Sequence, residues 1–326
     1  MILNALKMMP EDERKTIWLF SGQGSQYYSM AREWYAGEPA FREAFDACDR
    51  WAREIAARPL AEIVYGPRED RFAPFDRLLD SHLALFAVQW ATASLLRSRG
   101  VRCDALGGYS LGEIVAATVA GAIRPQDAFE LICTHARQAE ATLPPGRMSA
   151  IMKAGGEPWF EEGEGVWIAA RNFDGHFVIT GSPQAVLQRE QEAEARGFAV
   201  HSLPVRYAFH SPESRALEPV FKDALKRFQW KQPNLPLWSA ATGWKTGDWD
   251  PYELYRGIGG AIDFARQLQH LEAEGPWDYL DAGPSGTSAT FVKYNLLPDS
   301  ESRPYVICSP FGNESEKLAD LLVPTR

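Results

Sequence analysis

One serine in the sequence has the surroundings of a catalytic nucleophile. Ser110 stands at the centre of the segment GYSLG at 108–112, which fits the pattern G-x-S-x-G. A short strand pattern at 104–110 precedes a periodic apolar stretch from Leu111 to Ala120, and strand, sharp turn and helix is the order that a nucleophile elbow needs. Such a turn exposes the serine oxygen at a helix N-terminus, where backbone N–H groups can hold an oxyanion. The pattern indicates acyl transfer through a serine ester, although glycine and serine are also common in plain turns.

A serine nucleophile needs a general base, and the chain has six histidines. His210, in the segment YAFHS at 207–211, follows directly on a strand-rich stretch and is the best-placed candidate. His82 and His270 fall on helical patterns and His176 falls in a turn, so structural or solvated roles are expected for these three. His201 falls within a predicted strand.

A second glycine corner, SGQGSQ at 21–26, follows the apolar run at 16–20. In a parallel sheet this corner would lie at the carboxyl edge beside the elbow, where ligands bind. There the backbone N–H groups of Gln23 and Leu111 could supply the two oxyanion donors of acyl transfer. On spacing alone, a plain strand-to-helix turn without a catalytic role explains this glycine corner equally well. No lysine follows the final glycine, which argues against a phosphate-binding loop.

Composition narrows the range of partners and locations. The 326 residues carry 34 basic and 43 acidic side chains, a net charge of −9, which offers no general attraction for nucleic acid or an anionic membrane. The four cysteines lack metal-ligand spacing and a disulfide framework, so we expect no metal and a reducing compartment. The N-terminus lacks an export signal, and the apolar stretch 83–96 is shorter than the roughly 20 residues of a membrane span. A cytoplasmic, monomeric protein is expected.

The order of predicted elements indicates an α/β protein with a parallel sheet. Strand patterns at 16–20, 104–110, 236–240, 277–280 and 305–308 alternate with helical patterns. Between 148 and 204 the pattern changes to strand, helix at 157–162, strand, strand, helix, strand, which is typical of a ferredoxin-like module. We therefore predict a large domain formed by 1–146 and 209–326 and a small domain at 147–208, with the binding cleft between them.

Several segments occur in an order that resembles the malonyl-CoA:acyl-carrier-protein transacylase family, which includes the acyltransferases of polyketide synthases. These segments are FSGQGSQ at 20–26, GYSLGE at 108–113, AGAI at 120–123, RMSAIM at 147–152, Asn172, VITG at 178–181, AFHS at 208–211 and AGPSG at 282–286. The resemblance implies an α/β-hydrolase-like large domain with a ferredoxin-like insert. It also implies Ser110 as nucleophile, His210 as base oriented by a backbone carbonyl, and Gln23 and Leu111 as oxyanion donors, with Asn172 near the base.

One departure from the family pattern concerns the charge of the acyl group. Malonyl-type members carry an arginine 25 residues after the serine, which binds the free carboxylate, and here that position is His135. Arg137 is no substitute, because two positions along a helix correspond to a rotation of about 200°. A neutral imidazole cannot replace the bidentate cation, so malonyl is disfavoured. A protonated His135 that still binds a carboxylate is the alternative.

Other departures point in the same direction. Tyr109 stands where the family usually has a histidine, and the tetrad at 207–210 combines Tyr207 of methylmalonyl-type enzymes with Phe209 of malonyl-type ones. The sequence segment FSGQGSQYYSM at 20–30 is most similar to the corresponding segment of free-standing acyl hydrolases from polyketide systems whose acyltransferases are separate proteins. Together with His135 and Asn172, these side chains are the expected substrate-binding residues.

The resemblance therefore implies serine catalysis on acyl thioesters of an acyl carrier protein, whose phosphopantetheine belongs to the substrate, with no cofactor of the enzyme's own. Hydrolysis that removes short non-malonyl acyl groups is the leading hypothesis. Transfer of a non-malonyl acyl group, malonyl loading, and a catalytically silent docking protein are the alternatives.

Overall fold

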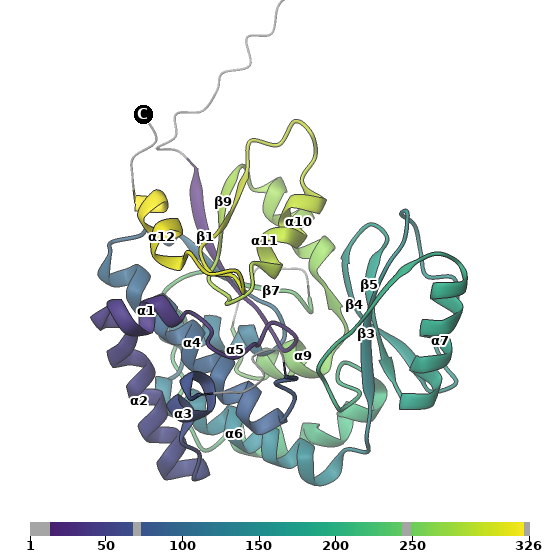
Figure 1. Ribbon diagram of the computed structural model, residues 1–326, viewed down its shortest axis with the longest axis horizontal. Helices are drawn as coiled ribbons and strands as arrows, with labels where there is room; N and C mark the ends of the chain where they lie inside the picture. The colour runs from purple at the N-terminus through teal and green to yellow at the C-terminus, as the bar shows by residue number, and fades with distance from the viewer. Residues whose placement is uncertain (1–13, 68–72, 243–248, 323–326) are drawn as a thin grey trace, which may run out of the picture.

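The computed structural model describes residues 14–67, 73–242 and 249–322. Two five-stranded sheets organise this part of the chain. Figure 1 shows the small sheet and its helix α7 at one side of the molecule, beside the larger body that contains the other helices. The N-terminal residues 1–13, on which the expectation about export rests, lie outside the described residues.

The large sheet is parallel throughout, as the apolar strand patterns predict. Its order is β10 (Arg303–Val306), β9 (Trp277–Asp281), β1 (Lys15–Phe20), β2 (Ala105–Gly108) and β7 (Leu237–Ser239). The central strand β1 is buried from Ile17 to Phe20, because helices cover both of its faces. The carboxyl ends of β1 and β2 are adjacent, since Phe20 pairs with Gly108. The two glycine corners therefore start from neighbouring positions at one edge of the sheet.

Helices surround this sheet. They are α1 (Arg32–Gly37), α2 (Pro39–Ala56), α3 (Leu60–Tyr65), α4 (Leu78–Ser98), α5 (Leu111–Val119), α6 (Pro125–Thr142), the 3₁₀ helix η2 (Pro212–Leu217), α8 (Glu218–Leu225), α9 (Glu253–Gly259), α10 (Phe264–Ala273), α11 (Thr287–Asn295) and α12 (Glu314–Leu322). Helix α4 is buried on nearly every side, which agrees with its apolar composition and with a position in the core. No helix among the described residues is both long and apolar enough to cross a bilayer.

The small sheet has ferredoxin-like strand order. Strands β6 (Ala199–Ser202), β3 (Arg147–Met152), β5 (His176–Gly181) and β4 (Val166–Phe173) are antiparallel neighbours in that order, and α7 (Pro183–Ala195) packs on them. A short strand β8 (Ile262–Asp263) then adds to β4 in parallel. Since β8 comes from the segment assigned to the large domain, the sheet extends beyond the predicted insert. The division at residues 147 and 208 stays a prediction.

One predicted element is absent. The helix expected at 157–162 is a series of bends and turns, so the connection from β3 to β4 lacks the first helix of a complete βαββαβ module. Glycines at 155, 156, 163 and 165 all take positive φ values, a backbone conformation that ends helices and forms turns. Trp159 and Phe160 in this segment pack against the core of the small sheet.

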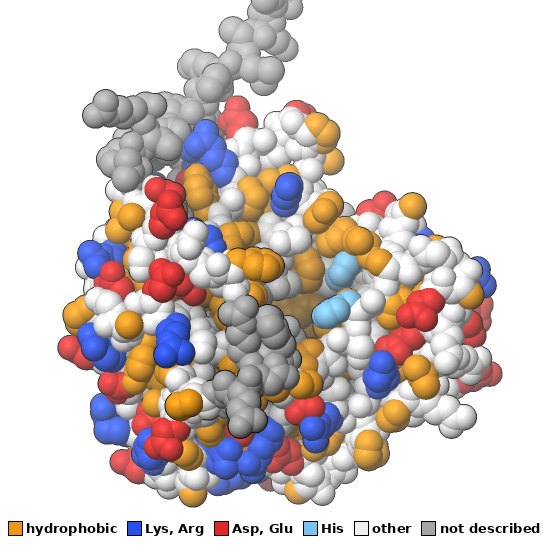
Figure 2. Space-filling view, in the orientation of Figure 1, with side chains coloured by type: hydrophobic (Ala, Val, Ile, Leu, Met, Phe, Trp, Pro, Cys, Tyr) orange, Lys and Arg blue, Asp and Glu red, His pale blue; other side chains and the backbone are white. Residues whose placement is uncertain are grey.

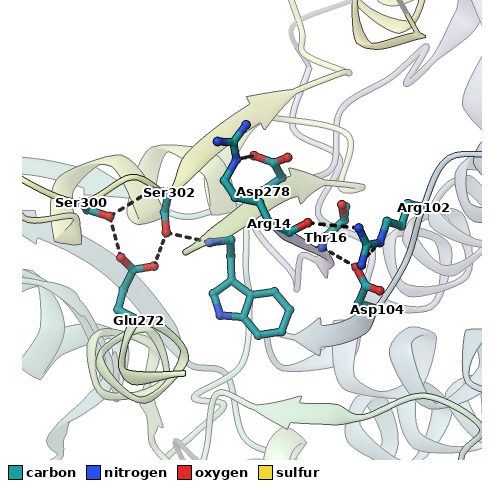
Figure 3. Close-up of polar contacts among 9 residues, drawn as sticks. Arg14, Thr16, Arg102, Asp104, Glu272, Asp278, Ser300 and Ser302 are labelled. Atoms are coloured by element: carbon teal, nitrogen blue, oxygen red, sulfur yellow. Dashed lines mark hydrogen bonds and ion pairs between the residues drawn. The ribbon is translucent and has the colours of Figure 1, made fainter. Parts of the chain in front are cut away.

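Polar contacts hold the amino ends of the parallel strands, at the sheet edge opposite the glycine corners (Figure 3). Asp104, just before β2, accepts the backbone N–H of Thr16 at 2.7 Å and pairs with Arg102. Arg14, just before β1, pairs with Asp278 of β9 at 3.1 Å. These contacts tie the starts of β1, β2 and β9 together, and thereby help to fix the register at the carboxyl edge.

Candidate active site

The elbow at Ser110 has strained nucleophile geometry. Ser110 has φ 54° and ψ −120°, outside the regions that non-glycine residues favour, and it immediately precedes α5. The flanking glycines are required by close packing: a Cβ on Gly112 would lie 2.0 Å from the carbonyl oxygen of Phe20, and one on Gly108 would lie 2.3 Å from the Cα of Glu113. Gly112 therefore lets the turn fit against the end of β1, and Gly108 lets α5 begin close to β2.

His210 lies within hydrogen-bond distance of the serine. Its Nε2 is 2.9 Å from the Ser110 Oγ, and its Nδ1 is 2.7 Å from the backbone carbonyl oxygen of Gly260. Because a carbonyl can only accept, Nδ1 carries the proton and Nε2 is free to accept the serine proton. The pair has the geometry of a Ser–His dyad in which a carbonyl takes the place of the usual carboxylate, and the roles of Ser110 as nucleophile and His210 as base stay predictions.

Burial sets the protonation state of this base. It lowers the pKa of His210 to about 4, although the hydrogen bond to Gly260 opposes the shift. The imidazole is therefore neutral at pH 7, as a general base must be. Thr180 fixes the preceding backbone, since its Oγ1 donates to the carbonyl oxygen of Phe209 at 2.9 Å.

The first glycine corner lies against the elbow. A Cβ on Gly22 would be 2.7 Å from the carbonyl oxygen of Tyr109. Gln89 of α4 holds the corner from beneath, accepting from the Ser21 N–H at 2.7 Å and donating to the Ser21 carbonyl at 3.0 Å. Gln23 and Leu111 both line the cavity beside Ser110, and neither backbone N–H donates to another described residue. Their role as oxyanion donors stays a prediction that this geometry permits.

A narrow cavity of about 40 Å³ adjoins the dyad. Its lining is mostly apolar and consists of Gln23, His82, Tyr109, Ser110, Leu111, His135, Met148, Ala169, Ala170, Val178, Leu203, Val205, Phe209, His210, Ile258 and Ile262. None of these described residues is a lysine, arginine, aspartate or glutamate. We refer to this space as the acyl cavity.

His135 lies in the aromatic part of the acyl cavity. Its ring centroid is 6.1 Å from that of His82, 6.0 Å from Phe209 and 5.8 Å from Phe221. Burial, with the nearby His210 as a smaller cause, lowers the pKa of His135 to about 4. Arg137 points elsewhere, as the helical rotation predicts: it is exposed and donates to the carbonyl oxygen of Ile55 at 2.9 Å. The cavity therefore has a neutral imidazole where a carboxylate-binding cation would be needed.

The other predicted substrate-binding residues lie at different depths. Phe209 lines the acyl cavity, whereas Tyr207 packs behind it, 5.9 Å between ring centroids, and does not line the cavity. Tyr109 lies between the acyl cavity and a larger one and donates its hydroxyl to the Asn172 Oδ1 at 3.0 Å. Asn172 in turn contacts the Nδ1 of His176 at 3.1 Å. Tyr207 and Asn172 are thus one layer away from the acyl cavity itself.

The larger cavity, of about 230 Å³, adjoins the acyl cavity, with which it shares Gln23, Tyr109, Val178 and Leu203 as lining residues. Glycine-corner residues 21–25 form one wall, and Asn172, His176 and His201 form part of the other. Figure 2 shows histidine side chains at a hollow with a hydrophobic floor between the large body and the small sheet. Because it lies next to the acyl cavity, we call this larger space the entry channel.

Sequence reasoning missed the position of His82. It was expected to be structural or solvated, yet it lines the acyl cavity beside His135. A signal was present, because His82 is the one imidazole within a helix that is otherwise apolar on all sides from Leu83 to Val88. His176 and His201 likewise line the entry channel. Among the described residues, no cluster of three or more histidine, cysteine or carboxylate side chains could hold a metal ion.

Comparison with known proteins decides the family. Residues 17–254 match the model of the acyl transferase domain, and they include the elbow, the first glycine corner and His210. This chain belongs to the acyl transferase domain family.

Two relatives match over nearly their whole lengths. The polyketide biosynthesis acyltransferase homolog BaeD of Bacillus velezensis is 34% identical over 94% of this chain and 95% of its own. The homolog PksD of Bacillus subtilis is 31% identical over 93% and 94%.

Solved acyltransferases share the fold of this family member. The acyltransferase domain from the second module of the salinomycin polyketide synthase superposes with a TM-score of 0.80 at 28% identity, covering 95% of this chain and 72% of that one. FabD of Acinetobacter baumannii superposes with a TM-score of 0.79 at 22% identity, covering 96% of this chain and 99% of that one. The α/β-hydrolase-like large domain and ferredoxin-like small domain are therefore confirmed as the fold class.

Proposed function

We propose that this acyl transferase family member is a serine hydrolase that removes short, uncharged acyl groups from acyl carrier protein in polyketide biosynthesis. The observation that carries the proposal is the acyl cavity, which adjoins Ser110 and His210 and has no lysine or arginine among the described residues that line it. A malonyl carboxylate bound there would lack a positive partner, and an unpaired buried charge is strongly disfavoured. The relatives named for polyketide biosynthesis support the pathway, and the acidic carrier protein is the proposed partner.

In the first half-reaction, Ser110 attacks the thioester carbonyl carbon while His210 Nε2 takes the hydroxyl proton. The carbonyl oxygen becomes an oxyanion, which the backbone N–H groups of Gln23 and Leu111 would stabilise. As the C–S bond breaks, His210 returns its proton to the sulfur, and the carrier leaves as a free thiol. The acyl group remains as an ester on Ser110, with its chain in the acyl cavity.

In the second half-reaction, water enters through the entry channel and attacks the ester carbonyl. His210 takes a proton from the water and then protonates the departing Ser110 oxygen, which releases the free carboxylic acid. A phosphopantetheine thiol that attacks the ester in place of water would give acyl transfer instead. The volume of the entry channel, about 230 Å³, is the observation that favours transfer as the second candidate function.

Intact mass spectrometry distinguishes these outcomes. Acetyl-, butyryl- and malonyl-carrier protein would each be incubated with the enzyme, with and without a second holo-carrier. We expect acetyl- and butyryl-carrier to become free holo-carrier without an acceptor. Loss of the acyl group only when the second carrier is present would instead establish transfer, and rapid consumption of malonyl-carrier would contradict the proposed acyl class.

The nucleophile is tested separately with a serine-reactive fluorophosphonate. We expect the probe to label the wild-type protein and not Ser110→Ala. Persistent labelling of the variant would refute Ser110 as the nucleophile. An unlabelled wild-type protein would favour a catalytically silent docking protein.

A further inference from the structure

Two imidazoles lie side by side at the acyl cavity. His82 projects from α4 and His135 from α6, their ring centroids are 6.1 Å apart, and both line the space beside Ser110. Both are at most 6% exposed. Aromatic side chains pack around them, with Phe209 centred 6.1 Å from His82 and 6.0 Å from His135. Apart from Gln23, Tyr109, Ser110 and His210, these two imidazoles are the only polar side chains among the described residues that line the cavity.

The hydrogen-bonding capacity of these imidazoles is largely unused. His135 makes no hydrogen bond with another described residue. The Nδ1 of His82 is buried near the Leu78 carbonyl, which opposes the fall of its pKa. Its Nε2 makes no hydrogen bond with another described residue and is the ring nitrogen available to the cavity. Buried polar groups are nearly always paired, so unpaired ones at a binding cavity indicate a partner supplied by a ligand or by water.

Neither imidazole is charged near neutral pH. Burial, with a smaller contribution from His135, lowers the pKa of His82 to about 3, and burial lowers that of His135 to about 4. In the described parts of the chain, no carboxylate lines the cavity to favour their protonation. A neutral imidazole has one N–H donor and one nitrogen acceptor, and it can therefore bind an uncharged hydroxyl or carbonyl group.

The size of the cavity limits where such a group can be. A site of this kind needs about 10–15 Å³ for each water-sized group, and the cavity of about 40 Å³ therefore has room for about three or four such groups. These correspond to C2, C3 and one or two atoms bonded to C3. An oxygen on C3 of a short acyl group would lie within the cavity.

We propose that His82 and His135 form a hydrogen-bonding site for an uncharged oxygen on C3 of the acyl group, so that short 3-hydroxyacyl and 3-oxoacyl thioesters are preferred over their alkyl counterparts. The inference rests on the proposed acyl-enzyme at Ser110 and names its substrate class. A plain butyryl group would fill the same space but leave both imidazoles unpaired, which disfavours it relative to its oxygenated counterpart.

The test compares 3-hydroxybutyryl- with butyryl-carrier protein, which differ by one oxygen atom. The readout is kcat/KM for loss of the acyl group, together with the intact mass of the acylated enzyme. We expect the 3-hydroxybutyryl substrate to be preferred about tenfold. A ratio near one, or a preference for butyryl, would overturn the inference while leaving acyl-enzyme formation intact. Failure of every substrate to acylate Ser110 would overturn the proposed function as well.

Variants assign the preference to the imidazoles. His135→Phe and His82→Leu replace an imidazole with an apolar side chain and so remove its polar atoms. We expect each variant to reduce the ratio of kcat/KM for 3-hydroxybutyryl- over butyryl-carrier protein toward one. His135→Asn retains a donor and an acceptor and is expected to restore part of the preference. His270→Gln, on α10 outside the cavity, controls for loss of a histidine and should keep the wild-type ratio. An unchanged ratio in both cavity variants would overturn the assignment even if one of them folds poorly.

Discussion

The substitution His135→Arg tests whether the acyl cavity excludes a charged acyl group because its lining residues carry no cation. The new guanidinium would be placed among His82, Phe209 and Phe221, with no carboxylate among the described lining residues. An unpaired buried charge costs about 3–5 kcal/mol, so the free energy of unfolding should fall by that amount. For a chain of this size, about 2 °C of Tm per kcal/mol gives a decrease of roughly 6–10 °C.

The matched control is His135→Gln, which is uncharged and similar in length. It should lower the Tm by much less, because it leaves no unpaired charge. Thermal unfolding of both variants measures this difference in Tm. In a second experiment, malonyl-CoA is added so that its carboxylate can pair with the new guanidinium. We expect malonylation of Ser110 to increase in the arginine variant only, and to recover part of its lost Tm. Equal Tm values for the two variants, with unchanged malonylation, would show that position 135 does not face the acyl group.

Three further predictions follow from buried groups of the site. The pKa of His210, about 4, predicts that labelling of Ser110 by a fluorophosphonate falls only below about pH 5, since the base must be unprotonated; a midpoint near 6.5 would contradict this. Burial raises the pKa of Glu113 to about 8, so the native state binds its proton more tightly than the unfolded state, and stability falls as pH rises from about 4.5 to 8. Glu113→Gln should therefore gain stability relative to wild type between pH 6 and 8, by up to about 1.4 kcal/mol per pH unit in urea unfolding, and identical pH slopes would refute this. Tyr109→Phe leaves the buried Asn172 oxygen without its donor and should lower the unfolding free energy by about 1–3 kcal/mol, whereas an unchanged value would mean that water replaces the hydroxyl.

Local sequence patterns were sufficient to predict the elements that position the dyad. The apolar run at 16–20, the elbow at 108–112 and the strands of the small sheet correspond to β1, the β2–α5 turn and β3–β6. Each is defined by short-range chemistry: apolar residues on both strand faces, or glycines at positions where a Cβ would clash. The helix at 157–162 was wrong because glycines on both sides of it favour turns over a helix.

The composition of the acyl cavity could be predicted only in part. His135 was recognised because it departs from a family pattern at a defined spacing. His82 was not, because its place beside His135 depends on how α4 packs against α6, which no local pattern specifies. The carbonyl of Gly260 that orients His210 is likewise a backbone group brought from 50 residues away, and no side-chain motif marks it.

The central claim is that Ser110 accepts uncharged acyl groups and releases them to water. Its most direct test mixes equal amounts of acetyl- and malonyl-carrier protein with the enzyme in H₂¹⁸O and follows both carriers and the released acids by mass spectrometry. We predict that acetyl-carrier is consumed first and that one ¹⁸O atom appears in the acetate. Preferential loss of malonyl-carrier, or consumption of acetyl-carrier without ¹⁸O-labelled acetate, would contradict the account.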